Sequence, residues 1–119
     1  MKFNILMPNK LIPFYQKELV AVKNNLQLND FQKAWYHLER AHIIAQKYPY
    51  EHTFVHCKML QFGIKIKNTK EVLGQIPRLL VGGVKSFVNY IPEGNTGGAN
   101  VPPLKPMEIP EDIKEMFKS

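Results

Sequence analysis

Apolar side chains recur every three or four residues through the first half of this 119-residue chain, and this spacing limits the fold more than any other feature. It matches the turn of an α-helix rather than the alternation of a strand. The spacing predicts helices at about 10–28, 31–47 and 51–67, with Asp30 as the N-cap of the second and Pro49 as its end. We therefore expect an all-α fold, a small helical bundle in which 31–47 and 51–67 form an antiparallel helical hairpin.

A fourth helix is expected to be irregular. Thr69 can cap a helix that starts at Lys70, but Pro77 removes a backbone donor in its interior and Gly82-Gly83 weakens it again. The sequence therefore predicts a kink, or two short helices, within 72–90.

The composition changes after residue 91. Residues 92–110 hold five prolines and three glycines, which is typical of an extended arm. The acidic start of 111–117 predicts a short terminal helix. We expect a single helical domain over 1–119, with a helical body at 1–91 and the arm and short helix at 92–119. The arm is able to close over the hairpin as a lid, with polar contacts from Asn95, Thr96 and Asn100, although such residues are also ordinary in turns.

The composition excludes several classes of protein. Apolar residues make up 45% and charged residues 22%, as in globular proteins. The single cysteine, Cys57, excludes an intramolecular disulfide and a four-cysteine zinc ribbon. The longest weakly polar stretch, 72–90, contains Pro77, Arg78 and Lys85, so no membrane span is expected. The N-terminus does not resemble a signal peptide, and we expect a cytoplasmic protein.

All four histidines lie within twenty residues, at His37, His42, His52 and His56, close to Glu39. At about 100° per residue, Glu39 and His42 share one helix face, as do His52 and His56, while His37 points elsewhere. In a hairpin folded about residue 49, His42 lies opposite His56. One carboxylate and three imidazoles therefore converge from two helices.

This set predicts a metal site with Glu39, His42, His52 and His56 as ligands. Imidazole with carboxylate suits zinc first, with iron, copper and nickel as alternatives, and suits calcium or magnesium poorly. Cys57 is expected to be a buried or half-buried small residue. The alternative is a structural polar network in which Glu39 accepts a hydrogen bond from His42.

Six short strings together resemble the bacterial domain-of-unknown-function family 3703, over about residues 10–112. They are HLERAH within 34–42, EHT and VH within 51–56, GQIPRLL at 74–80, GNTGGANV at 94–101 and KPM at 105–107. The resemblance implies membership but no established activity. Genes of this family often lie near heavy-metal efflux or resistance genes, so the resemblance implies a role with metals. An aromatic residue is expected at position 57, so it also implies that Cys57 is not a ligand.

A weaker resemblance is to the second half of one tetratricopeptide unit, on Asn29-Asp30-Phe31, Ala34, Leu38-Glu39-Arg40-Ala41 and Pro49. That motif normally occurs in several copies, and no second copy is present. It implies a helical protein-interaction module.

The leading hypothesis is a small metal-binding protein for transition-metal homeostasis or resistance, with no catalytic residues. The chain carries no phosphate loop or nucleophile elbow, so we expect a binding protein rather than an enzyme. A hydrolytic or oxidative enzyme becomes possible only if water reaches the metal. The alternative is a tetratricopeptide-like interaction module without metal, with a protein partner or a second copy of itself. The net charge of +6 leaves nucleic acid as a third, disfavoured partner, because no helix-turn-helix signal accompanies the basic residues.

Overall fold

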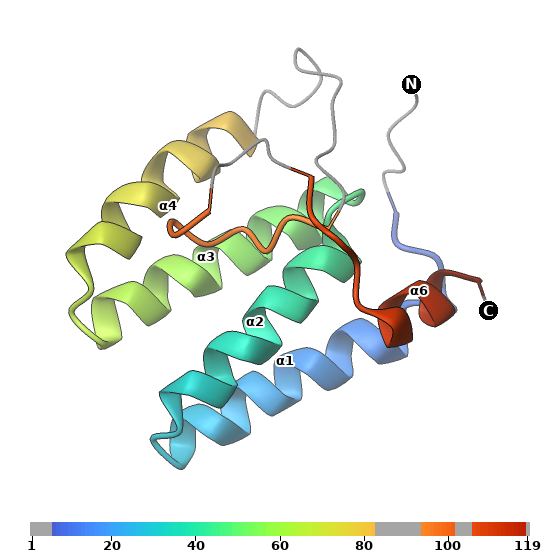
Figure 1. Cartoon of the computed structure of the whole chain (residues 1–119), viewed down its shortest axis with the longest axis horizontal. Coiled ribbons are helices and arrows are strands. Elements are labelled where there is room, and N and C mark those ends of the chain that lie inside the picture. The colour runs from blue at the N-terminus through green and yellow to red at the C-terminus, as the bar shows by residue number, and fades with distance from the viewer. Residues whose placement is uncertain (1–5, 83–93, 102–105, 119) are drawn as a thin grey trace.

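The structure, a computed structural model of the chain, describes residues 6–82, 94–101 and 106–118. Over these ranges the regular secondary structure consists of helices and includes no strand, which confirms the all-α prediction. The helices are α1 (Ile12–Gln27), α2 (Phe31–Ala45), α3 (Pro49–Lys65), α4 (Thr69–Gly82) and α6 (Glu111–Lys118). Helices α2 and α3 run in opposite directions as the predicted hairpin (Figure 1).

The helix boundaries follow local signals. The Asp30 carboxylate accepts a hydrogen bond from the backbone N–H of Lys33 at 3.1 Å, so Asp30 caps α2 as predicted. Helix α2 ends at Ala45, and Pro49 is the first residue of α3, two residues before the predicted start of that helix. Proline suits this position because the first N–H groups of a helix have no intrahelical acceptor. The cap of α4 is Asn68 rather than Thr69, since the Asn68 side chain accepts from the Glu71 N–H at 3.0 Å.

Helix α4 continues through Pro77 as far as Gly82. Up to residue 82 the structure therefore shows one helix, and 83–90, the rest of the stretch in which a kink or two short helices are expected, lies outside the described residues. Pro77 is exposed, whereas Glu71 and Gln75 are buried on another face of the helix. Because that buried face provides the packing, one missing backbone donor does not break the helix.

The helices pack in chain order, α1 on α2, α2 on α3 and α3 on α4. The apolar core lies between them, and its least exposed large side chains are Leu11, Leu38, Ile44, Val55, Met59 and Ile113. Helix α6 packs on the other helices through the buried Ile113 side chain and through an ion pair. The Arg40 guanidinium binds the Glu18 carboxylate of α1, with Nε and Oε1 3.0 Å apart, and the Asp112 carboxylate of α6.

Residues 94–101, here called the strap, cross from α4 to the C-terminal end of α2 (Figure 1). Three residues on one face of α4 hold it. Ala99 donates its N–H to the Glu71 carboxylate at 3.1 Å, and Gln75 donates to the Gly97 carbonyl at 2.9 Å. Arg78 donates to the carbonyl of Val101 at 2.9 Å. The strap is therefore tied to α4 by three polar side chains about 20–30 residues away in the sequence, of which Glu71 and Gln75 are buried.

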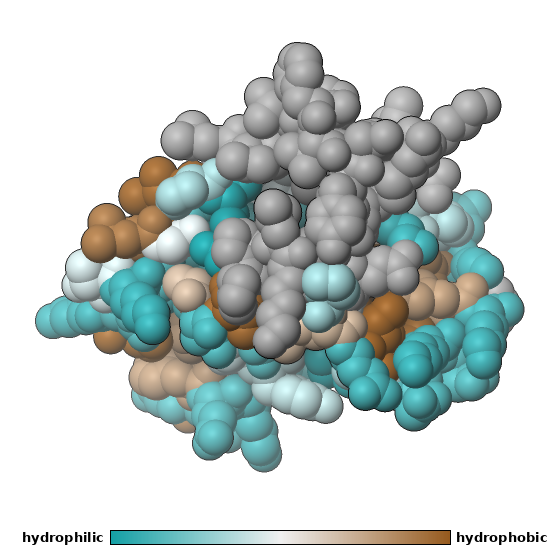
Figure 2. Space-filling view, turned by 45° about the horizontal axis from the view of Figure 1, so that its top comes forward, coloured by the Kyte–Doolittle hydropathy of each residue, from teal (hydrophilic) through white to brown (hydrophobic). Residues whose placement is uncertain are grey.

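The visible surface carries apolar side chains over α4 at the left of Figure 2. On this helix Leu73 and Ile76 are 63% and 44% exposed. None of the described helices combines the length and the apolar composition that a membrane crossing requires.

Candidate metal centre

Three imidazole rings meet where the last turn of α2 faces the first two turns of α3. The Nε2 atom of His42 lies 2.8 Å from that of His52 and 3.1 Å from that of His56. The Nε2 atoms of His52 and His56 are 3.1 Å apart. The three residues are 8% exposed or less, so the cluster is buried.

The hairpin geometry explains this convergence. His52 and His56 are four residues apart on α3 and so lie on one face, one turn apart. His42 reaches them from α2, as expected if it lies opposite His56. The structure thus brings together the three histidines that the helical spacing selected.

The hydrogen bonds on the far side of two rings determine which nitrogen carries the proton. His42 Nδ1 lies 2.7 Å from the backbone carbonyl of Asn95, which can only accept, so this Nδ1 carries hydrogen. His56 Nδ1 lies 2.7 Å from Gln75 Oε1. Gln75 is oriented with its oxygen toward His56 because its amide nitrogen donates to Glu71 and to the Gly97 carbonyl. Both rings, when neutral, therefore direct an Nε2 lone pair into the cluster.

Two lone pairs at 3.1 Å repel each other unless a positive centre lies near them. A proton on His52 Nε2 supplies such a centre for one neighbour at a time, whereas a metal ion accepts all three lone pairs together. Ligating histidines are normally oriented in this way, by a hydrogen bond from the second ring nitrogen to a carbonyl or carboxylate. The donor set and its tautomers therefore fit a metal ion.

The distances also fit a transition metal. Imidazole nitrogens at 2.0–2.1 Å from a tetrahedral zinc ion are about 3.3–3.4 Å apart. The observed separations of 2.8–3.1 Å are slightly smaller, so each ring needs to move outward by only a few tenths of an ångström. An all-nitrogen set matches zinc, copper, iron or nickel, and it lacks the oxygen donors that calcium and magnesium need.

A family of proteins of unknown function, DUF3703, matches residues 9–117 of the chain. The chain belongs to the DUF3703 family. Searches of curated proteins and of solved structures find no match. The description of the DUF3703 family assigns no activity to its members.

In this DUF3703 protein the strap closes one side of the cluster. Gly97 has a φ of 86°, a conformation that favours glycine, and its Cα lies against the His42 ring. A Cβ atom built there would lie 2.6 Å from His42 Nε2. The Gly97 N–H donates to Asn95 Oδ1 at 2.9 Å, which holds the turn that presents the Asn95 carbonyl to His42. Backbone of the strap therefore lies directly against the His42 imidazole.

The Glu71 carboxylate is linked to His56 through the side-chain amide of Gln75. Gln75 Nε2 donates to Glu71 Oε2 at 2.5 Å, and the same amide accepts from His56. Glu71 is 7% exposed. The Glu71 carboxylate thus lies one hydrogen bond beyond the amide that His56 contacts, where it would offset part of the charge of a cation held by the imidazoles without being a ligand itself.

Glu39, the fourth predicted ligand, does not join the three histidines in the group whose ligand atoms lie within 4.8 Å of one another. It is one turn before His42 on α2, and the hairpin places His52 and His56 at the level of His42. Burial raises the pKa of Glu39 above its ordinary value, hydrogen bonding from Trp35 opposes this rise, and the charge of Glu71 adds to it. Of the four predicted ligands, the structure brings together the three histidines, and Glu39 lies one helical turn before His42.

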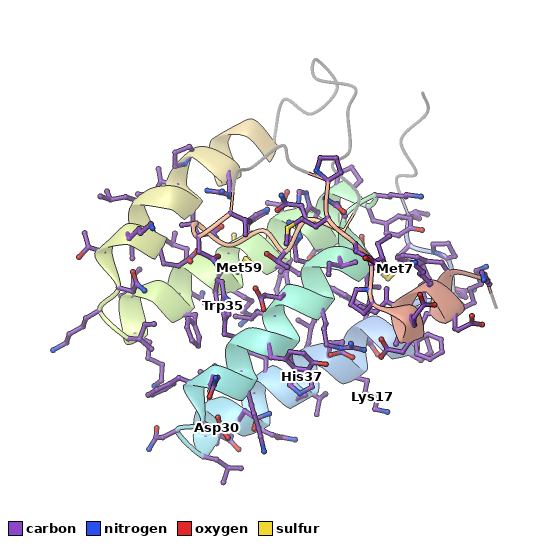
Figure 3. All side chains as sticks on the ribbon, viewed as in Figure 1. Met7, Lys17, Asp30, Trp35, His37 and Met59 are labelled. Atoms are coloured by element: carbon purple, nitrogen blue, oxygen red, sulfur yellow. The ribbon has the colours of Figure 1, made fainter. Side chains whose placement is uncertain are left out.

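His37 points away from the cluster, as the helical spacing predicts, and faces α1 (Figure 3). Its Nδ1 lies 2.8 Å from the Glu18 carboxylate. Cys57 is exposed rather than buried or half-buried, because it lies on the solvent side of α3, opposite the helix face that packs on α2.

The sequence interpretation missed the role of Gln75 and Glu71, which had no place in the predicted site. Their spacing of four residues within an amphipathic helix was a signal that both share a face. Nothing local indicated that this face meets His56. Asn95 was expected to make polar contacts, but the group that contacts His42 is its backbone carbonyl, which any residue provides.

Proposed function

We propose that this DUF3703 protein binds one transition-metal ion through His42, His52 and His56, with zinc as the first candidate. One observation carries the proposal. Three buried Nε2 atoms lie within 3.1 Å of one another, and the partners of Nδ1 in His42 and His56 direct two lone pairs inward. Zinc bound by three histidines leaves a fourth position for a non-protein ligand.

Holding the ion, rather than catalysis, is the task that this geometry favours. The rings are buried, and the strap backbone at Gly97 lies against His42. A catalytic metal needs a position open to water and substrate. A cytoplasmic protein that stores, buffers or transfers a metal, in homeostasis or resistance, is the function we infer.

The experiment is zinc titration calorimetry on untagged protein, combined with elemental analysis of the protein as purified. The wild type is expected to bind one equivalent. His42→Ala and His56→Ala are each expected to bind less than about a tenth of an equivalent, since two imidazoles hold zinc much more weakly than three. His37→Ala is the matched control, because it removes the one histidine outside the site and leaves one equivalent bound.

Cobalt substitution adds a readout that a general loss of folding cannot imitate. A tetrahedral site gives intense visible absorption of Co²⁺, and circular dichroism verifies that each variant keeps its helices. Wild-type protein that binds less than a tenth of an equivalent of zinc, copper, nickel or iron contradicts the proposal. Equal binding by the His37→Ala and His42→Ala variants contradicts the ligand assignment.

A further inference from the structure

Helices α1 and α3 both pack on α2 but diverge from each other, and a groove of about 590 Å³ lies between them. We call it the lysine-edged groove. Its lining residues on α1 are Leu19, Val20, Val22, Lys23, Leu26 and Gln27. Its other lining residues are Leu38 of α2 and Phe54, Lys58, Gln61, Phe62 and Lys65 of α3. The metal centre contributes none of these residues, so the groove is a separate feature.

The floor and walls of the groove are apolar. Leu38, Val22 and Phe62 at its base are at most 6% exposed, whereas Val20 and Phe54 on opposite walls are 56% and 37% exposed. Water leaves such surface favourably when a complementary apolar face covers it. The groove therefore offers apolar contact along its whole length.

The length of the groove matches a helix. On α3 the lining residues run from Phe54 to Lys65, which is about 16 Å at 1.5 Å per residue. That is three turns, enough for apolar anchors at positions i, i+3 or i+4, and i+7 of an added helix.

The charge at the edges defines the chemistry of the occupant. Every charged lining residue is a lysine, Lys23 on the α1 side and Lys58 and Lys65 on the α3 side. Lys58 lies over the Phe54 ring, with Nζ 5.3 Å from the ring centroid, which keeps its charge beside the apolar wall. Lys58 and Lys65 are seven residues apart, so they lie almost in line and about 10 Å apart along α3.

We propose that the lysine-edged groove binds an acidic amphipathic helix of another protein. Its apolar stripe fills the groove, and acidic residues on both sides of the stripe meet Lys23, Lys58 and Lys65. A second copy of this chain in a symmetric arrangement brings lysine against lysine and is repelled. Nucleic acid has no apolar face for the floor, and a lipid surface does not enter a concave groove.

The test is fluorescence anisotropy with designed helical peptides of about 14 residues, measured in the presence of a metal chelator. One series carries leucines at i, i+4 and i+7 with glutamates beside them, in each register of the leucines. The second series is identical except that lysines replace the glutamates. The glutamate series is expected to bind one-to-one, and the lysine series at least tenfold more weakly.

Charge reversal locates the binding. The double variant Lys58→Glu/Lys65→Glu is expected to bind glutamate peptides about tenfold more weakly, the effect of two moderate ion pairs, and to bind lysine peptides better than the wild type does. Lys17→Glu makes the same type of charge change on α1 outside the groove, where Lys17 projects outward (Figure 3), and is expected to change nothing. These lysines are not core residues, so the variants should fold, and circular dichroism verifies it.

Three outcomes overturn the proposal. They are no saturable binding of any glutamate peptide at about 1 mM, equal weakening by Lys17→Glu, and displacement of the peptide by anionic vesicles or DNA with no effect of the double variant.

Discussion

Replacing Gly97 by alanine puts a methyl group into the metal centre from the strap side. The new Cβ would lie 2.5 Å from Cδ2 and 2.6 Å from Nε2 of His42, where ordinary carbon contacts are about 3.5–4.0 Å. Either the ring or the strap therefore has to move by about 1 Å. A shift of about 1 Å exceeds the few tenths of an ångström by which the rings adjust to a metal, so we expect zinc affinity to fall by about ten- to hundredfold.

Gly97→Ala also has a cost without metal. An alanine at a φ of 86° is strained by about 1–2 kcal/mol. For a domain of this size that lowers the melting temperature by about 4–8 °C. Calorimetric unfolding of the metal-free protein measures this part, and zinc titration against a chromophoric chelator measures the affinity.

Gly74→Ala is the matched control, because its Cβ would lie 2.3 Å from Ala99 Cβ and so pushes on the same strap without touching His42. We expect it to lower stability but to reduce zinc affinity less than Gly97→Ala does. Wild-type zinc affinity in Gly97→Ala would refute the placement of the strap on the His42 ring. Equal affinity losses in the two variants would show that the strap as a whole, and not the contact with the imidazole, controls binding.

Three further predictions concern the acids and the strap. Burial raises the pKa of Glu39 above 4.5, so the folded protein loses stability as the pH rises through that value. We therefore expect Glu39→Gln to stabilise the metal-free protein at pH 7 and to give no gain below about pH 4. Urea unfolding at both pH values tests this, and an equal gain at both would contradict it. The Arg40 side chain lowers the pKa of Asp112 below 3.8, so the ion pair stabilises the fold above that pH and this stabilisation is lost as the pH falls further. We expect Asp112→Asn to be slightly less stable than the wild type at pH 7 and equally stable near pH 2 in the same assay. A lower stability that persists in acid would argue against the ion pair. Because His42 and Gln75 hold the strap, we expect zinc to slow amide hydrogen exchange at residues 94–101 in the wild type and to leave it unchanged in His42→Ala. Unchanged exchange in the zinc-loaded wild type would show that metal binding does not stabilise the strap.

Local features of the sequence were sufficient for most of the helical body. The apolar spacing and Asp30 placed α2 because helix periodicity and N-capping act within a few residues. The same local information does not show that α4 continues through Pro77, since it says nothing about the packing of Glu71 and Gln75 that supports this helix.

The candidate site divides in the same way. His42, His52 and His56 were predictable because a short hairpin relates positions by counting from its turn. Glu39 lies outside that group of three, and its role as a ligand stays a prediction. Counting from the turn does not give the distance between its carboxylate and the imidazoles. Nor does counting show that α1 and α3 diverge and leave a groove.

What the amino-acid sequence alone determined is the all-α class, the hairpin and the three histidines that it brings together, since these depend on interactions between near neighbours in the chain. Only the tertiary structure decided which ring nitrogen of His42 and of His56 carries hydrogen, because the deciding partners, the Asn95 carbonyl and Gln75, are 53 and 19 residues away from these rings. Contacts over such separations depend on how whole helices and the strap pack, and this packing is not encoded in any local pattern.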